Sequence, residues 1–192
     1  MTPVTRQEAT EARRAQIMRA TIDVLAERGY AATTFEAICE RAGLSSKRLI
    51  TYHFSSKDEL MAAIAGQVIA DAAAFMRPAL DAAAGARGLV GAYIRANVAF
   101  IAAHPTHIRA LNQVVFHGVP GWDGEHDAAV DRIAALFADG QRAGVFREFE
   151  PRLMATALRA AIDASATPLM DGLDPVRCGD ELAETFDRAT RA

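Results

Sequence analysis

The chain has 192 residues, about half of them apolar, which is enough for one large domain or two small ones with a sizeable core. Its net charge of −3 does not indicate a nucleic-acid binder, but residues 1–60 carry nine basic against eight acidic side chains and are less acidic than the rest. The polar N-terminus lacks a signal-peptide core, and no stretch looks apolar for long enough to span a bilayer. We therefore expect a cytoplasmic protein with no membrane partner.

The composition also favours one class of secondary structure. Alanine is abundant, whereas β-branched and aromatic residues are sparse, so the sequence predicts an all-α protein of about nine helices. The first predicted helix begins near Thr5, whose spacing to Glu8 fits a capping box, and ends at Gly29. The two cysteines, Cys39 and Cys178, lie far apart on different predicted helices, and we expect both to be reduced.

Residues 33–54 predict two short helices around a tight turn. Thr33 precedes Glu36 by three residues, which is the spacing of a capping box, and Gly43 ends the first helix. Ser45 or Ser46 opens the second helix, whose apolar anchors are Leu49, Ile50 and Phe54. Its other positions carry donors or rings, and a donor-rich second helix after a glycine turn is typical of a helix-turn-helix. In that motif the second helix enters the DNA major groove.

The rest of the chain predicts further helices. Ser56 and Glu59 have capping-box spacing and open a helix that runs to about residue 76, with Pro78 following it. Apolar periodicity then predicts helices over residues 87–103, 106–117 and 125–143, one that begins at Pro151, and a last one that begins at Pro175. We expect residues 1–56 to form a DNA-binding domain and residues 57–192 a helical domain for ligand binding and dimerisation.

The run from Thr33 to Leu60 resembles the DNA-binding segment of the TetR family of transcriptional regulators. The resemblance is carried by Thr34 with Ile38 and by three short motifs, Ala42-Gly43-Leu44-Ser45, Tyr52-His53-Phe54 and Ser56-Lys57-Asp58-Glu59-Leu60. It implies an all-helical homodimer that binds a palindromic operator in double-stranded DNA and is released by a small-molecule effector. The stretch from Gly43 to Phe54 is one residue longer than the common family pattern, and Thr51 falls where many members have tyrosine.

The predicted DNA contacts lie in and around the second helix of the motif. Lys47 and Arg48 occupy its first turn, where side chains point at base edges, and arginine can pair bidentately with guanine. Whether Thr51 or Tyr52 reaches phosphate is open, and His53 could equally brace the first helix. Lys57 at a helix start is a candidate for phosphate. The full predicted set is Thr33, Thr34, Ser45, Ser46, Lys47, Arg48, Thr51, Tyr52, His53 and Lys57.

Two further sets are predicted in residues 57–192. Polar groups on apolar faces favour an effector cavity, with candidates Phe75, Tyr93, Asn97, Phe100, His104, Asn112, Phe116, Trp122, Met154 and Asp163. Simple packing in a helical core is the alternative for most of them. The last two long helices combine small and large apolar residues and predict a dimer face built on Leu158, Ala161, Ile162, Leu182 and Phe186.

Two other functional classes were weighed against a ligand-responsive repressor, namely a small helical enzyme and a protein-interaction module. No nucleophile elbow, phosphate-binding loop or paired metal motif supports an enzyme, and the loosely spaced Gly85, Gly88 and Gly91 do not follow a strand. We therefore expect no catalytic residue, no cofactor and no metal site. The effector, the operator sequence and the direction of regulation are not readable from the residues.

Overall fold

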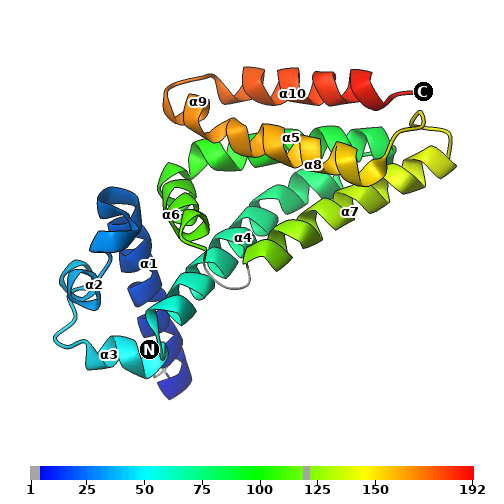
Figure 1. Cartoon of the computed structure of the whole chain (residues 1–192). Helices are drawn as coiled ribbons and strands as arrows, with labels where there is room; N and C mark the ends of the chain where they lie inside the picture. Colours follow the sequence, from blue (N-terminus) through cyan, green and yellow to red (C-terminus); the bar gives the residue numbers. More distant parts are fainter. Residues whose placement is uncertain (1–4, 119–121) are drawn as a thin grey trace. The chain divides into compact units, whose positions relative to one another are not determined.

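The computed structural model describes residues 5–118 and 122–192, and these residues form ten α-helices without a β-strand (Figure 1). The all-α class is therefore confirmed. The helix count exceeds the expected nine because a short extra helix, α9, follows α8. The helices are α1 (Arg6–Ala32), α2 (Phe35–Ala42), α3 (Arg48–His53), α4 (Lys57–Asp81), α5 (Gly85–Ala103), α6 (Pro105–Phe116), α7 (Trp122–Arg142), α8 (Pro151–Ala164), α9 (Ala166–Met170) and α10 (Pro175–Thr190).

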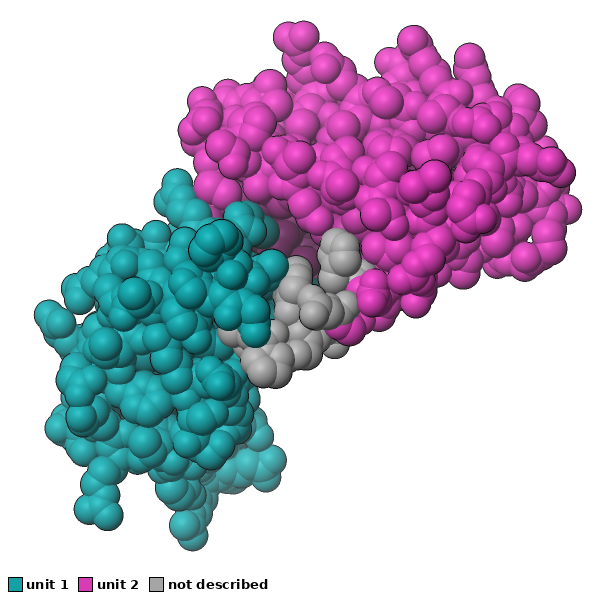
Figure 2. Space-filling view, in the orientation of Figure 1, with its two compact units in different colours: residues 1–69, 106–122 teal, residues 70–105, 123–192 magenta. Residues whose placement is uncertain are grey.

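The chain divides into two compact units, coloured separately in Figure 2. Unit 1 comprises residues 1–69 and 106–122, and unit 2 comprises residues 70–105 and 123–192. This division differs from the boundary predicted after residue 56, because the core of unit 1 needs more of the chain. Ala110 and Val114 of α6 are completely buried in the same cluster as Ile17 of α1 and Leu60 of α4. The assignment of functions to residues 1–56 and 57–192 stays a prediction.

Local hydrogen bonds explain where the helices of unit 1 begin. Thr5 and Glu8 form the predicted capping box, with the Glu8 N–H donating to the Thr5 hydroxyl and the Thr5 N–H donating to the Glu8 carboxylate. The predicted capping role of Thr33 is wrong. Thr34 caps α2 instead, accepting from the N–H of Ala37. At the start of α4 the Ser56 hydroxyl accepts from the Glu59 N–H as predicted.

Gly29 interrupts α1 with φ 77° and ψ 174°, so the regular helix does end where the sequence predicts. The positive φ favours glycine, because other residues are strained there. The break is secured by α6, since the side-chain oxygen of Gln113 accepts a hydrogen bond from the N–H of Tyr30 at 3.1 Å. The His117 ring, just after α6, stacks on the Tyr30 ring with centroids 4.2 Å apart. Residues far apart in sequence thus complete the end of α1.

Two expectations about α4 are corrected. Pro78 does not end it, because the helix continues to Asp81 with the proline inside. By length and composition α4 could also cross a bilayer, contrary to the expectation that no segment could. Its first part nevertheless packs in the core of unit 1, where Leu60 and Ile64 are completely buried.

Unit 2 is built around α5, which α10 packs against along its length. The inner positions of both helices are apolar, with Ile94 and Phe186 buried. The C-terminus is tied back to the α7–α8 connection, where the Arg147 N–H donates to the Thr190 carbonyl at 2.9 Å. Both α8 and α10 start as predicted with proline in the first turn, after the capping side chains of Glu150 and Asp174.

Candidate nucleic-acid interface and effector site

The predicted helix-turn-helix is present as α2, a turn and α3. Gly43 ends α2 in the left-handed conformation, with φ 64° and ψ 36°. The Ser46 hydroxyl accepts from the N–H of Arg48, so Ser46 supports the first turn of α3. Ile38 and Ile50 are completely buried, and Phe54 is nearly so. The apolar side of each short helix therefore lies in the core of unit 1 and fixes which residues face solvent.

The exposed side of α3 presents the two strongest predicted DNA contacts, and they differ in their surroundings. The Lys47 ammonium is paired with the Glu36 carboxylate of α2, and this hydrogen bond lowers the pKa of Glu36 and raises that of Lys47. Arg48 is exposed, and within the described parts of the chain no hydrogen bond or ion pair engages its guanidinium. Arg48 is thus free to bind an external acceptor, whereas the Lys47 ammonium already donates one of its three N–H groups to Glu36.

The remaining donors of α3 differ in how far their side chains are exposed. Thr51 is exposed and Tyr52 is 71% exposed, so both can reach a ligand outside the protein. His53 is only partly exposed. Its burial, followed by the charges of Arg14 and Arg13, lowers its pKa. The Arg14 guanidinium lies 4.7 Å from the centre of the Phe54 ring, on the α1 side of this surface. Thr34, Ser45 and Ser46 are also exposed.

Two predicted DNA contacts do not face outward. Thr33 is only 1% exposed, and its hydroxyl donates to the carbonyl of Gly29. The Lys57 ammonium donates to the Tyr30 carbonyl at 2.9 Å, and burial lowers its pKa. Both side chains hold the broken end of α1 in place. Their polarity serves internal hydrogen bonds, which the capping-box spacing of Thr33 and the helix-start position of Lys57 did not reveal.

In unit 2 the structure brings three predicted effector residues together around one that the sequence analysis missed, Arg159 of α8. Its Nη1 donates to the Tyr93 hydroxyl at 3.0 Å and to the Asn97 side-chain oxygen at 3.2 Å. Its Nη2 donates to Asp163, one turn further along α8. The i to i+4 spacing between Arg159 and Asp163 was a signal in the sequence that could have identified the pair.

Three more predicted effector residues form an aromatic cluster. The Phe75 ring of α4 lies 5.6 Å from both the Phe100 and the His104 rings, and those two rings are 4.6 Å apart. Tyr93, Asn97, Phe100 and His104 follow one another at helical spacing, so they share one side of α5. The aromatic cluster and the Arg159 cluster are therefore neighbours along that side.

The other effector candidates are not gathered at this site. Asn112 and Phe116 belong to unit 1 and are exposed, Phe116 by 86%. Met154 is half-buried and in none of the contacts given above, and the side chain of Trp122 lies outside the described residues. The predicted set therefore combined residues of two neighbouring clusters with scattered side chains, because helical periodicity alone does not specify which helices meet.

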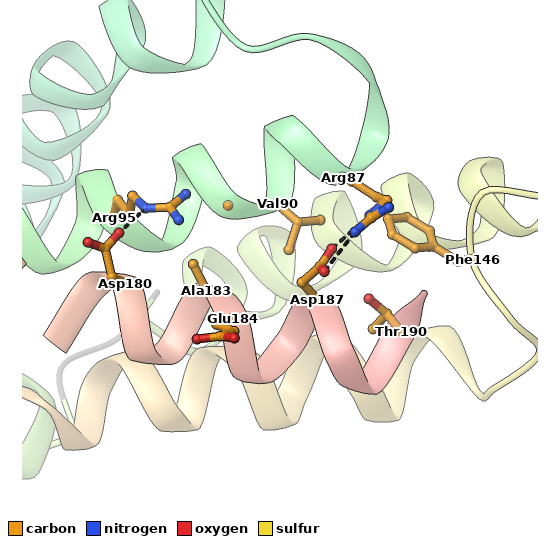
Figure 3. Close-up of a pocket in the computed structure, with 10 residues that line it drawn as sticks. Arg87, Val90, Arg95, Phe146, Asp180, Ala183, Glu184, Asp187 and Thr190 are labelled. Carbon is orange, nitrogen blue, oxygen red and sulfur yellow. Dashed lines mark hydrogen bonds and ion pairs between the residues drawn. The ribbon is translucent and has the colours of Figure 1, made fainter. Parts of the chain in front are cut away.

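A separate groove of about 360 Å³ runs between α5 and α10 (Figure 3). Its walls include two ion pairs across these helices, Arg87 with Asp187 and Arg95 with Asp180. Among the described residues that line it, none is a predicted effector contact. Because both arginines already bind carboxylates of α10, we interpret the groove as a packing contact between α5 and α10 that is held by ion pairs, and not as the effector site.

The predicted dimer face is largely internal. Leu158, Ile162 and Phe186 are at most 8% exposed within the single chain, so they form its core and cannot meet a partner. Ala161 and Leu182 are half-buried. The large apolar side of α8 thus packs inward, whereas its outer side carries an exposed stripe of three alanines and one leucine. That stripe, here called the α8 outer stripe, consists of Leu153, Ala157, Ala160 and Ala164.

Comparisons with known proteins agree with this geometry. Residues 17–64, which span most of α1, then α2, the turn, α3 and the first part of α4, match the sequence model described as "Bacterial regulatory proteins, tetR family". The chain is 25% identical over 187 residues to the HTH-type transcriptional regulator RutR of Escherichia coli K12, covering 92% of this chain and 85% of RutR.

Solved structures share the fold of the whole chain. A TetR-like transcriptional regulator from Rhodococcus sp. RHA1 superposes with a TM-score of 0.77 at 23% identity, covering 92% of this chain and 94% of that one. A bacterial regulatory protein in the tetR family, also from Rhodococcus RHA1, gives 0.80 at 20% identity, with 94% and 97% covered. At these identities the likeness concerns the fold.

Proposed function

Since this chain is a DNA-binding transcriptional regulator of the TetR family and not an enzyme, we propose that it is a cytoplasmic repressor that binds a palindromic operator as a homodimer. A small-molecule effector releases it from the DNA. The observation that carries the proposal is the exposed side of α3, where a free Arg48 lies beside Lys47, Thr51 and Tyr52 over a completely buried Ile50. A recognition helix needs this combination of a fixed apolar side and free donors.

Each side chain on this surface has a role set by its chemistry. Arg48 reads a guanine in the major groove, because its fork matches the two acceptors of that base. Lys47 contacts phosphate or a base edge. Thr51, Tyr52 and the exposed hydroxyls of Thr34, Ser45 and Ser46 bind the DNA backbone, which positions the helix without reading sequence. His53 contributes from the edge of this surface.

Dimerisation follows from the small size of this surface. One α3 offers few contacts, whereas two copies related by two-fold symmetry and about 34 Å apart bind successive major grooves. The α8 outer stripe supports a self-complementary face, since its exposed alanines allow a second helix to approach closely. Two copies of α8 and α10 would then form a four-helix bundle.

Release by an effector requires that ligand and DNA favour different states of the same chain. The Arg159 cluster and the aromatic cluster of Phe75, Phe100 and His104 are the proposed effector site. Phe75 is on α4, the helix that follows the recognition segment and contributes residues to both units. We propose that effector binding shifts α4, so that the two α3 helices no longer match successive grooves.

A binding titration tests the proposed function. Purified chain is titrated against labelled DNA from upstream of its own gene and against a shuffled fragment, at 50 and 200 mM salt. We expect sequence-selective binding that weakens with salt, because released counterions drive phosphate contacts. Arg48→Ala is expected to lose selectivity, whereas Arg132→Ala, at an exposed arginine of α7, is expected to bind as the parent does. Equal affinity for both DNA fragments would exclude the proposed function as a sequence-specific repressor.

A further inference from the structure

Arg87 and Arg159 of unit 2 differ in the hydrogen bonds made by the Nε and Nη2 edge of the guanidinium. The Nε and Nη2 of Arg87 donate to the two oxygens of Asp187, each at 2.7 Å, so the fork is filled by one carboxylate. In Arg159 only Nη2 of this fork is used, and it donates to one Asp163 oxygen at 2.5 Å. The Nε of Arg159 is buried and has no hydrogen-bond partner among the described residues. Arg159 thus presents a half-filled fork.

The guanidinium of Arg159 is held in a fixed orientation. Its other edge donates to Tyr93 and Asn97, and the Asn97 amide is itself positioned by donating to the Tyr93 carbonyl at 2.8 Å. The Arg159 side chain is 16% exposed, compared with 49% for Asp163. A buried donor without an acceptor costs free energy. A carboxylate that accepts a hydrogen bond from the Nε of Arg159 would remove that cost.

We infer that the effector is a small aromatic monocarboxylic acid whose carboxylate completes the Nε–Nη2 fork of Arg159. The inference rests on the proposed function, because it names the ligand class of the same effector site. Planar carboxylates match the arginine fork bidentately. The partly exposed Asp163 already contributes one negative charge beside the fork, which favours a monoanion over a phosphate or a dicarboxylate.

The aromatic body of the ligand is assigned to the aromatic cluster. Phe100 and His104 follow Asn97 by three and seven residues, which corresponds to about 4.5 and 10 Å along a helix. A ring linked to a carboxylate by a short spacer covers such a distance. Phe75 is 43% exposed and lies edge-on to both rings, so it offers an apolar surface that a ligand can cover. Aromatic rings prefer such offset or edge contacts.

Matched acids and amides test the carboxylate. Benzoate, phenylacetate and 3-phenylpropionate are each compared with their primary amides by calorimetric titration and by the shift in melting temperature of the full chain, without DNA. We expect saturable binding of at least one acid and at least about tenfold weaker binding of its amide, since the fork pairs best with a charged acceptor. No binding of any acid, or equal binding of acid and amide, would overturn the inference.

Three variants place the acid at this fork. Arg159→Lys keeps the charge but removes the fork, and we expect about tenfold or more weaker binding of the acid. Asp163→Asn removes the competing carboxylate from an exposed position, so we expect tighter binding of the acid. Arg87→Lys is the matched control, because its fork is already filled, and we expect no change. Unchanged affinity in Arg159→Lys, or weaker binding in Asp163→Asn, would contradict the assignment.

The acid titration and the DNA titration fail independently. If the chain selects its upstream DNA but binds none of the acids, the inferred ligand class is wrong and the proposed repressor function is retained. If the chain binds an acid through Arg159 but shows no DNA selectivity, the repressor is wrong and the carboxylate site stands by itself. Addition of the acid to the protein–DNA complex is expected to raise the apparent Kd for DNA in the parent chain and not in Arg159→Lys.

Discussion

The ammonium of Lys57 lies 4.0 Å from the centre of the Tyr30 ring and donates to the carbonyl oxygen of the same residue. The His117 ring stacks on Tyr30 as well, so the tyrosine lies in contact with the start of α4 and with the residue that follows α6. From the sequence, a lysine at the start of a helix next to a recognition segment is predicted to contact phosphate. Here it belongs to the internal structure of unit 1.

Replacing Lys57 should therefore affect stability more than DNA binding. We expect Lys57→Met to lower the free energy of unfolding by about 1–2 kcal/mol through loss of the cation–π contact and the hydrogen bond. Chemical denaturation measures this. The salt dependence of DNA binding separates the two roles, because loss of one phosphate contact reduces the slope by about one. If the DNA affinity of Lys57→Met depended less steeply on salt than that of the parent chain, Lys57 would be a phosphate contact after all.

Glu36 holds Lys47 in the free protein and should oppose DNA binding. We expect Glu36→Gln to tighten DNA binding roughly two- to fivefold, since an exposed ion pair of modest strength no longer competes for the ammonium. Fluorescence anisotropy with labelled operator DNA measures the change. In a Lys47→Ala background the same substitution should have a smaller effect. An equal gain in both backgrounds would mean that Glu36 acts by general repulsion of phosphate.

The α8 outer stripe gives a prediction about the oligomeric state. We expect Ala160→Arg to convert a dimer into a monomer, because a long charged side chain prevents close approach of a second α8. Light scattering after size-exclusion chromatography gives the mass. Ala62→Arg, at an exposed alanine of α4, is the matched control and should remain dimeric. A dimeric Ala160→Arg would locate the dimer face elsewhere.

His53 makes stability depend on pH in a defined direction. Burial lowers its pKa below the ordinary value of 6.5, with Arg14 and Arg13 adding to the effect. The folded state therefore binds fewer protons than the unfolded state, and its stability decreases as the pH falls below that value. We expect His53→Gln to flatten the fall in melting temperature between about pH 6.5 and pH 5. A melting temperature of His53→Gln that falls as steeply as that of the parent chain would contradict the assignment.

The local features of the fold were predictable from the sequence because they depend on neighbouring residues. The capping box of Thr5, the turn at Gly43 and the cap at Ser56 each rest on contacts within four residues. The exposed donors of α3 followed from the same local pattern, since burial of Ile50 fixes the side that faces solvent.

Features that depend on distant contacts were not predictable in this way. Lys57 faces inward because its ammonium donates to the Tyr30 carbonyl, 27 residues earlier in the chain. Leu158 and Ile162 read equally well as a dimer face and as a core, because α8 is apolar on one side whichever surface covers it. Arg159 has meaning only once Tyr93 and Asn97 of α5 lie beside it.

The hydrogen bond from the Tyr30 N–H to Gln113 also limits how this protein can be taken apart. A fragment ending at residue 69 would keep every residue proposed to contact DNA, yet it would lack Gln113, Ala110 and Val114 of unit 1. Chimaeras that graft the N-terminal segment onto another regulatory domain would expose that core unless they carry α6 with it. Unit 1 is thus built from two separate segments of the chain. A chimaera that takes only the first segment would lack part of the core on which the DNA-binding helices pack.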